Sequence, residues 1–204
     1  MPRPLVLALA LVACLLGAAE PPPAVVDAAQ AVPIAVGATM PAATVKDVEG
    51  TAVDLATVWA EKPAVLVFYR GSWCPFCVRH LAALGGITKN LEDLGWTLVA
   101  ISPDQPAKLA PPEPDGIRRL SDQDALLMRG LGLAFTVDED TRVKYKGYGI
   151  DLEEASGRSH FILPVPAVIL VDRGGVVRFI HADADYRQRL DPAKVLEAAR
   201  AHGG

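Results

Sequence analysis

The chain has 204 residues, of which 51% are hydrophobic, which fits one good-sized domain with extensions. Its formal net charge is −4 and it has no cluster of basic residues, which argues against a nucleic-acid partner. Aromatic residues make up only 6% of the chain, too few for a surface on which bases stack.

Residues 1–19 have the pattern of a signal peptide. Arg3 supplies a positive start, residues 5–16 are an unbroken apolar run, and small residues follow at 17–19. Twelve apolar residues are too few for a permanent membrane-spanning helix. We therefore expect an exported protein, in the periplasm or another extracytoplasmic compartment, where disulfides persist.

A second interpretation of the same segment is a lipoprotein signal. Leu11-Val12-Ala13-Cys14 resembles the bacterial lipobox, in which the cysteine is lipidated and becomes the mature N-terminus. A lipid anchor at Cys14 is then the one membrane contact that the sequence suggests.

The segment that follows, residues 20–36, is rich in proline and alanine and has no regular period, so it is predicted to be a linker. The domain is expected to occupy residues 37–204. It should begin with a hairpin that turns at Glu49-Gly50.

Two cysteines lie between a predicted strand and a predicted helix. Residues 65–69 are apolar, β-branched or aromatic, as in a buried strand, and a turn over 70–72 leads to Cys74-Pro-Phe-Cys77. Proline after the first cysteine suits the first turn of a helix. The helix continues with apolar residues on one face, and a bend is expected at Gly85-Gly86.

This placement predicts redox chemistry. The free N–H groups and the dipole at a helix N-terminus favour a thiolate, so Cys74 is expected to be a solvent-accessible nucleophile. Cys77, one turn further on, can close a disulfide with it. Arg70 would favour the thiolate electrostatically, and Trp73 either flanks the dithiol as an apolar platform or simply packs.

Metal binding and an inert buried pair are the alternatives for the two cysteines. A structural zinc site needs four ligands, and His80 brings the local set to three. A copper-handling module would use Cys74, Cys77 and a histidine such as His160. The redox interpretation needs no cofactor.

Further along the chain, the composition predicts a mixture of strands and helices. We expect a buried strand over 96–102, an edge strand over 117–120, a helix over 122–129 capped by Ser121, a strand over 134–137, a helix from 138 to Tyr145, a hairpin of 167–171 and 176–180 turning at Asp172–Gly175, and a helix over 193–200 capped by Asp191.

The order of these elements is similar to the thioredoxin fold. More narrowly, the stretches 68–77, 101–104 and 163–172 resemble the AhpC/TSA peroxiredoxin-like (redoxin) family. The resemblance spans residues 37–202. It implies a single α/β domain with a central mixed sheet flanked by helices, and an antioxidant or disulfide-exchanging activity.

Two departures from these relatives bear on mechanism. Aligned on Phe68-Tyr69, the peroxidatic cysteine of peroxiredoxins falls on Cys77 and their threonine falls on Cys74. Their peroxide-orienting arginine falls on Pro166, which instead matches the cis-proline that thioredoxins place opposite the dithiol. The alternative is that this proline only ends a strand. The acid that thioredoxins bury in the strand before the dithiol is missing, since Val67 and Phe68 are apolar.

The sequence therefore predicts a thiol–disulfide oxidoreductase, with a hydroperoxide-reducing peroxidase as the alternative. Its expected partners are proteins that carry disulfides or thiols, with hydroperoxide as a further substrate, and an unidentified thiol reductant. The residues expected to carry the chemistry are Cys74, Cys77, Pro166, Arg70 and Trp73.

Overall fold

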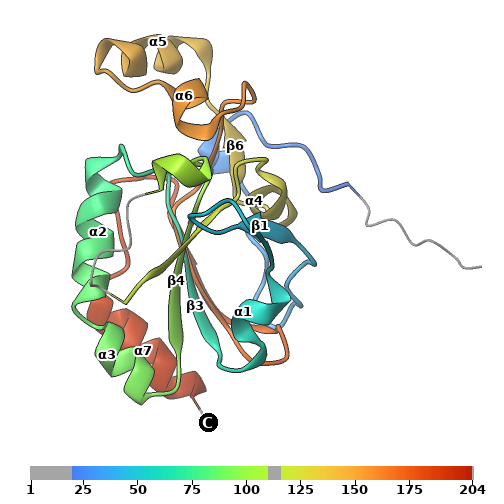
Figure 1. Ribbon diagram of the computed structural model, residues 1–204, viewed down its shortest axis with the longest axis vertical. Coiled ribbons are helices and arrows are strands. Elements are labelled where there is room, and N and C mark those ends of the chain that lie inside the picture. Colours follow the sequence, from blue (N-terminus) through green and yellow to red (C-terminus); the bar gives the residue numbers. More distant parts are fainter. Residues whose placement is uncertain (1–19, 110–115, 204) are drawn as a thin grey trace, which may run out of the picture.

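The computed structural model describes residues 20–109 and 116–203 (Figure 1). The predicted signal peptide and the lipidation site at Cys14 lie outside these residues. Within the described residues, no helix is both long and apolar enough to cross a membrane.

A seven-stranded mixed sheet forms the centre of the domain, in the order β2-β1-β5-β4-β3-β8-β9. β3, β4 and β5 are parallel, and β8 and β9 add antiparallel strands beside β3. The strands are β1 (Thr44–Lys46), β2 (Ala52–Asp54), β3 (Ala64–Phe68), β4 (Thr97–Ser102), β5 (Arg118–Ser121), β8 (Ala167–Val171) and β9 (Val177–Ala182).

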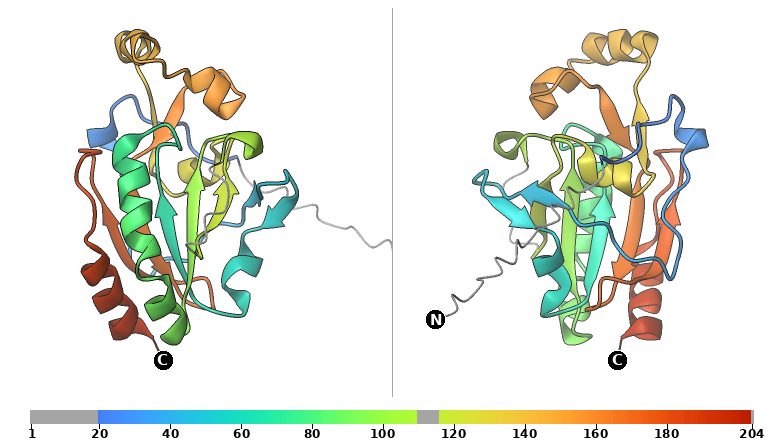
Figure 2. Two further views of the ribbon diagram at one scale, coloured as in Figure 1. Left: turned by 60° about the vertical axis from the view of Figure 1, so that its left-hand side comes forward. Right: turned by 90° about the vertical axis from the view of Figure 1, so that its right-hand side faces the viewer.

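Alternation along the strands divides the core between the two faces of this sheet. On β3, Val65 and Val67 face the helices α2 (Pro75–Gly85), α3 (Thr88–Asp93) and α7 (Pro192–His202). Leu66 and Phe68 face the opposite side, where α1 (Ala56–Ala60) and α4 (Leu126–Gly130) pack. Figure 2 shows these two layers of helices. The expected mixed sheet flanked by helices is confirmed.

A smaller unit lies beyond one end of the main sheet (Figure 1). It consists of the antiparallel strands β6 (Ala134–Thr136) and β7 (Ile162–Pro164) and the helices α5 (Glu139–Gly147) and α6 (Leu152–Ser156). Short 3-10 turns occur at Ala28–Gln30 and Pro106–Lys108. This smaller unit lies next to the N-terminal end of α2, the end that carries the two cysteines (Figure 1).

The segment predicted to be a linker packs against the domain. Ala24, Ala28 and Ile34 contact the core, and Val25 bridges to Phe135 of β6 through backbone hydrogen bonds. Its regular structure is limited to a short 3-10 turn and one β-bridge, and its small apolar side chains pack against the core. This segment forms one wall of the cavity described below.

Two predictions of local structure are wrong. β5 is not an edge strand, because β1 pairs with it through Lys46 and Ser121. The helix expected over 122–129 begins only at Leu126, and its N–H groups are capped by the buried carboxylate of Asp122 rather than by Ser121. The turn before the helix absorbs the first predicted residues.

Several other predictions are confirmed. β1 and β2 form the hairpin around Glu49-Gly50, and the chain bends after Gly85 so that α2 and α3 are separate helices. β8 and β9 pair across the turn at Asp172, and Asp191 caps α7.

Candidate active site around Cys74 and Cys77

The strand β3 and the helix α2 place the two cysteines as predicted. Cys74 is the N-cap residue of α2, with Pro75 in the first turn, and its carbonyl accepts the N–H of Cys77 at 3.0 Å. The loop before it is tight, because a side chain at Gly71 would lie 2.2 Å from Nε1 of Trp73. Glycine at this position therefore lets the indole lie beside the dithiol loop.

The two thiols are not equivalent. The hydrogen bond from the Cys77 thiol, supported by its backbone N–H and by the charges of Arg70 and Arg189, lowers the pKa of Cys74 from 9.0 to about 6 against the effect of burial. The same hydrogen bond and burial raise the pKa of Cys77. Cys74 is therefore the thiolate at neutral pH and Cys77 the proton donor.

The expected solvent accessibility of Cys74 is wrong for this conformation. Its side chain is only 1% exposed, as is that of Cys77, and both are free thiols. Trp73 and Phe76 pack against the cluster that contains both sulfurs. In this conformation the Cys74 sulfur is therefore closed to solvent.

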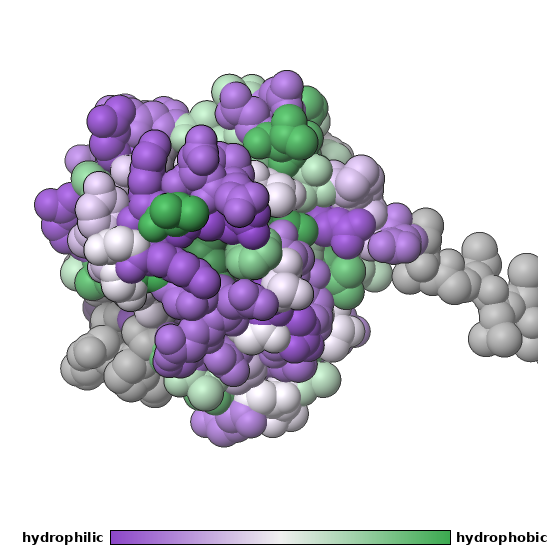
Figure 3. All heavy atoms as spheres, turned by 90° about the horizontal axis from the view of Figure 1, so that it is seen from above, coloured by the Kyte–Doolittle hydropathy of each residue, from purple (hydrophilic) through white to green (hydrophobic). Residues whose placement is uncertain are grey.

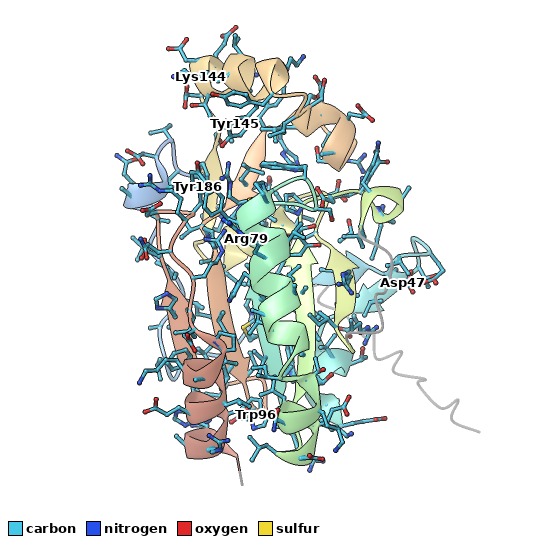
Figure 4. The ribbon with its side chains drawn as sticks, turned by 90° about the vertical axis from the view of Figure 1, so that its left-hand side faces the viewer. Asp47, Arg79, Trp96, Lys144, Tyr145 and Tyr186 are labelled. Atoms are coloured by element: carbon cyan, nitrogen blue, oxygen red, sulfur yellow. The ribbon has the colours of Figure 1, made fainter. Side chains whose placement is uncertain are left out.

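Arg70 lies at the centre of a cluster of aromatic rings. Its guanidinium carbon is 5.2 Å from the ring centroid of Trp73, 5.5 Å from that of Tyr145 and 4.1 Å from that of Tyr186. It also donates a hydrogen bond to the hydroxyl of Tyr145. Figure 4 shows Tyr145 between α5 and the upper end of α2, with Tyr186 on the neighbouring loop. Arg70 thus joins the cysteine loop, α5 and the loop before α7.

The loop before α7 also contacts Cys77. Nη2 of Arg189 lies 3.4 Å from the Cys77 sulfur. His80, one turn beyond Cys77, donates from Nε2 to the Leu190 carbonyl at 3.0 Å and so holds this loop against α2. Burial lowers the pKa of His80 to about 4, so its ring is neutral at pH 7.

A buried acid lies beside the cysteine loop, although not in the strand where thioredoxins have theirs. Asp104 follows β4, is 1% exposed, and accepts the backbone N–H of Ser72 at 2.7 Å. Burial raises its pKa to about 6, and the charge of Cys74 acts in the same direction. Asp104 is therefore an acid that titrates near neutral pH close to Cys74.

The structure does not support the cis form predicted for Pro166. The peptide bond before this residue is trans. The Pro166 carbonyl accepts the N–H of Asp183, and the preceding residue, Val165, donates to Leu133. The N–H of Val165 is therefore already paired beside β6 and is not free for an incoming chain. Pro166 still lines a cavity that Arg70 also borders.

The metal interpretation lacks a third ligand. Across residues 20–109 and 116–203, no three His, Cys, Asp or Glu side chains lie together as a metal site would require. Both ring nitrogens of His160 are engaged, one with the Gln123 carbonyl and the other with the N–H of Ile162. Within the described residues, His160 is therefore not placed to join Cys74 and Cys77 on a copper ion.

Of the residues selected from the sequence, Arg70, Trp73, Cys74 and Cys77 lie together, with Pro166 at the border of the adjoining cavity. Sequence reasoning missed four neighbours of these residues: Asp104, Tyr145, Tyr186 and Arg189. An acid directly after a buried strand was a usable signal for Asp104. The other three reach the site only through tertiary packing, which no local motif reveals.

Comparisons with known proteins identify the family. The model of the AhpC/TSA family matches residues 36–180, more than half of the chain, whereas no curated protein matches. Among solved structures, peroxidoxin BcpB from Mycobacterium tuberculosis is 18% identical, with a TM-score of 0.63 over 83% of this chain and 98% of that one. Reduced Prx3 from Vibrio vulnificus in complex with hydrogen peroxide is 22% identical, with a TM-score of 0.63 and the same coverage.

These structural likenesses confirm the thioredoxin-like fold of peroxiredoxins. The chain belongs to the AhpC/TSA family of thiol-dependent oxidoreductases.

Proposed function

We propose that the chain is a thiol–disulfide oxidoreductase in which Cys74 is the nucleophile and Cys77 resolves the intermediate. The observation that carries this proposal is the inequality of the two thiols, since Cys77 donates to Cys74 and lowers its pKa to about 6. An attacking thiol works best when its pKa is near the ambient pH.

The reaction balances without a cofactor. The Cys74 thiolate attacks a substrate disulfide, which forms a mixed disulfide and releases one substrate thiolate that takes up a proton. Cys77 then loses its proton, attacks the Cys74 sulfur and releases the second substrate thiol. The protein gains the Cys74–Cys77 disulfide, the substrate gains two electrons and two protons, and a thiol reductant of the same chemistry restores the dithiol.

Peroxide reduction is the second candidate, and the arginines favour it. Arg70 and Arg189 place positive charge near the sulfurs, and such charge would stabilise a peroxide oxygen as its O–O bond breaks. The Cys74 thiolate would become a sulfenic acid, release water or an alcohol, and condense with Cys77. Against it, the cysteine that aligns with the peroxidatic position, Cys77, has a raised pKa.

A stopped-flow comparison separates the two candidates. The reduced protein is mixed with equal concentrations of hydrogen peroxide or a neutral disulfide, and tryptophan fluorescence follows oxidation. If the disulfide oxidises the protein faster than peroxide does, the result supports disulfide exchange. If peroxide oxidises the protein much faster than the disulfide does, and one equivalent is enough, the protein is a peroxidase and this proposal is wrong. Cys74→Ser is the control that should abolish both reactions.

The compartment and partners belong to the same proposal. The signal-like pattern of residues 1–19 supports an exported protein, either processed or anchored through lipid at Cys14. In such a compartment a dithiol would meet disulfide-bearing proteins, small disulfides and hydroperoxides. Fractionation of cells that produce the full chain, followed by mass measurement of the mature N-terminus, tests this part.

A further inference from the structure

A cavity of about 350 Å³ borders Arg70, the residue whose charge acts on Cys74. One wall is the N-terminal segment at Val26–Ala28, and another is β6 with the start of α5. Arg70, Tyr145, Pro166 and Tyr186 complete the lining. The volume is typical of a site for a small molecule rather than for a folded protein.

The charge of Arg70 is incompletely compensated. Its side chain is 3% exposed and its Nε has no hydrogen-bond partner. In the described part of the chain, no Asp or Glu carboxylate forms an ion pair with it, and its one hydrogen bond goes to the neutral hydroxyl of Tyr145. A buried cation is costly unless a negative charge faces it.

The Cys74 thiolate supplies that negative charge only before the reaction. Arg70 stabilises the thiolate in the reduced protein. When Cys74 attacks a disulfide, its charge moves to the departing sulfur and leaves with the product. Arg70 then needs another anion, and a carboxylate on the substrate would supply one with a geometry that suits a guanidinium.

We propose that this cavity binds the carboxylate of a small disulfide substrate on Arg70, which directs the disulfide bond toward Cys74. The inference rests on the proposed function and adds a substrate class to it, namely carboxylate-bearing disulfides of low molecular mass. A small substrate also suits the burial of Cys74, since a protein disulfide would need a larger opening.

Two carboxylates also border the cavity, and their charges oppose an anionic ligand only weakly. Asp27 and Asp138 are exposed and accept backbone N–H groups of the turns they cap, so their charges are screened by solvent. Figure 3 shows that the surface at this end of the molecule is mainly hydrophilic. This face offers polar surroundings for a charged ligand.

A binding experiment without thiol chemistry tests the cavity directly. The probe is suberate, the dicarboxylate in which methylenes replace the two sulfurs of 3,3′-dithiodipropionate, and 1,8-octanediol is its neutral counterpart. Amide NMR shifts of the Cys74→Ser protein, in which no thiolate competes for Arg70, should saturate with suberate at Val137, Asp138 and Tyr145, and should not respond to the diol; the variants used in this titration are made in the same background. Arg70→Met should weaken suberate binding about tenfold or more, whereas Arg79→Gln, a change of equal charge on the exposed face of α2, should not.

A kinetic experiment then tests substrate choice. Wild type and variants are oxidised at pH 8 by 3,3′-dithiodipropionate and by the neutral 2-hydroxyethyl disulfide, and the ratio of the two rates is compared between proteins. This double ratio cancels the intrinsic reactivity of each disulfide and the effect of Arg70 on the thiolate. Arg70→Met should lower the ratio about tenfold, Arg79→Gln should keep it, and Arg70→Lys, which retains the charge and a long stem, should keep part of it.

The outcomes separate the inference from the function on which it rests. Suberate shifts that are absent, that map away from the cavity, or that are unchanged in both Arg70 variants would overturn the assignment, as would an unchanged double ratio. If neither disulfide oxidises the protein, the proposed function fails, and the suberate titration still decides whether the cavity binds carboxylates.

Discussion

Replacing Cys77 by alanine removes the thiol that donates a hydrogen bond to Cys74, and the pKa of Cys74 should rise as a result. The protein lowers the pKa of Cys74 from 9.0 to about 6, which corresponds to about 4 kcal/mol of stabilisation of the thiolate at 1.36 kcal/mol per pH unit. A hydrogen bond to a charged group contributes about 1.5–3 kcal/mol of such an effect. Cys77→Ala should therefore move the titration midpoint of Cys74 up by about 1–2 pH units.

Cys77→Ser is the matched control, because its hydroxyl keeps a donor of similar size at the same place. Its midpoint should stay within about half a pH unit of the wild-type value. The assay is the thiolate absorbance near 240 nm together with the pH profile of alkylation by iodoacetamide. The midpoint is the quantity to compare, since a lower pKa also reduces intrinsic nucleophilicity and compresses rate differences at a single pH.

Two results would refute this reasoning. A wild-type midpoint near 9 means that Cys74 is an ordinary thiol and that the helix start and Cys77 do not activate it. A midpoint near 6 that is the same in Cys77→Ala means that the activation comes from the arginines instead. In that case Arg70→Met should raise the midpoint where Cys77→Ala did not.

Three further predictions concern the groups around the dithiol. Because the pKa of Cys74 is lower in the folded than in the unfolded protein, the Cys74 thiolate stabilises the fold above the unfolded value near 9, and this stabilisation is lost as the pH falls to about 6. The free energy of unfolding of reduced wild type, measured in urea relative to Cys74→Ser, should therefore grow by up to about 4 kcal/mol between pH 6 and 9. A difference that does not change with pH contradicts the assignment. Asp104 has a raised pKa, so the cost of ionising it in the folded protein appears as the pH rises above 3.8 and is complete above about 6. Asp104→Asn keeps an oxygen for the Ser72 N–H, and its free energy of unfolding should rise by about 3 kcal/mol relative to wild type between pH 4 and 7. A difference that is independent of pH argues against a buried carboxylate. The side chain added by Gly71→Ala would collide with the Trp73 indole, so this variant should destabilise the fold by about 1–3 kcal/mol. If Trp73 covers the Cys74 sulfur, its displacement should also speed the alkylation of Cys74 in the native protein. An unchanged rate of alkylation would show that Trp73 does not cover the sulfur.

The fold was largely predictable from the sequence because its central elements carry strong local signals. Three local signals each determine conformation almost alone, and the structure follows them: the apolar run of β3, the proline after Cys74 and the glycines at the end of α2. Helix α4 was misplaced because the buried Asp122 caps it from four residues before its start. That capping depends on burial, which a local pattern does not show.

The candidate site was predictable only where it is local. The C-x-x-C spacing identified the dithiol, but the burial of Cys74 depends on the tertiary packing of the core cluster around it. Tyr145 and Tyr186 meet Arg70 from segments 75 and 116 residues away in sequence. The isomer of the bond before Pro166 was inferred from the resemblance to thioredoxins, whereas here the bond is trans and the N–H of Val165 is paired with Leu133.

Trapping the mixed disulfide tests the central claim most directly. Reduced Cys77→Ser is mixed with a small disulfide and analysed by peptide mass spectrometry, in parallel with wild type and Cys74→Ser. The account predicts a stable adduct on Cys74 in Cys77→Ser, an internal Cys74–Cys77 disulfide without adduct in wild type, and no reaction in Cys74→Ser. An adduct on Cys77 in Cys74→Ser that forms at the wild-type rate, or a wild type that never forms the internal disulfide, would contradict it.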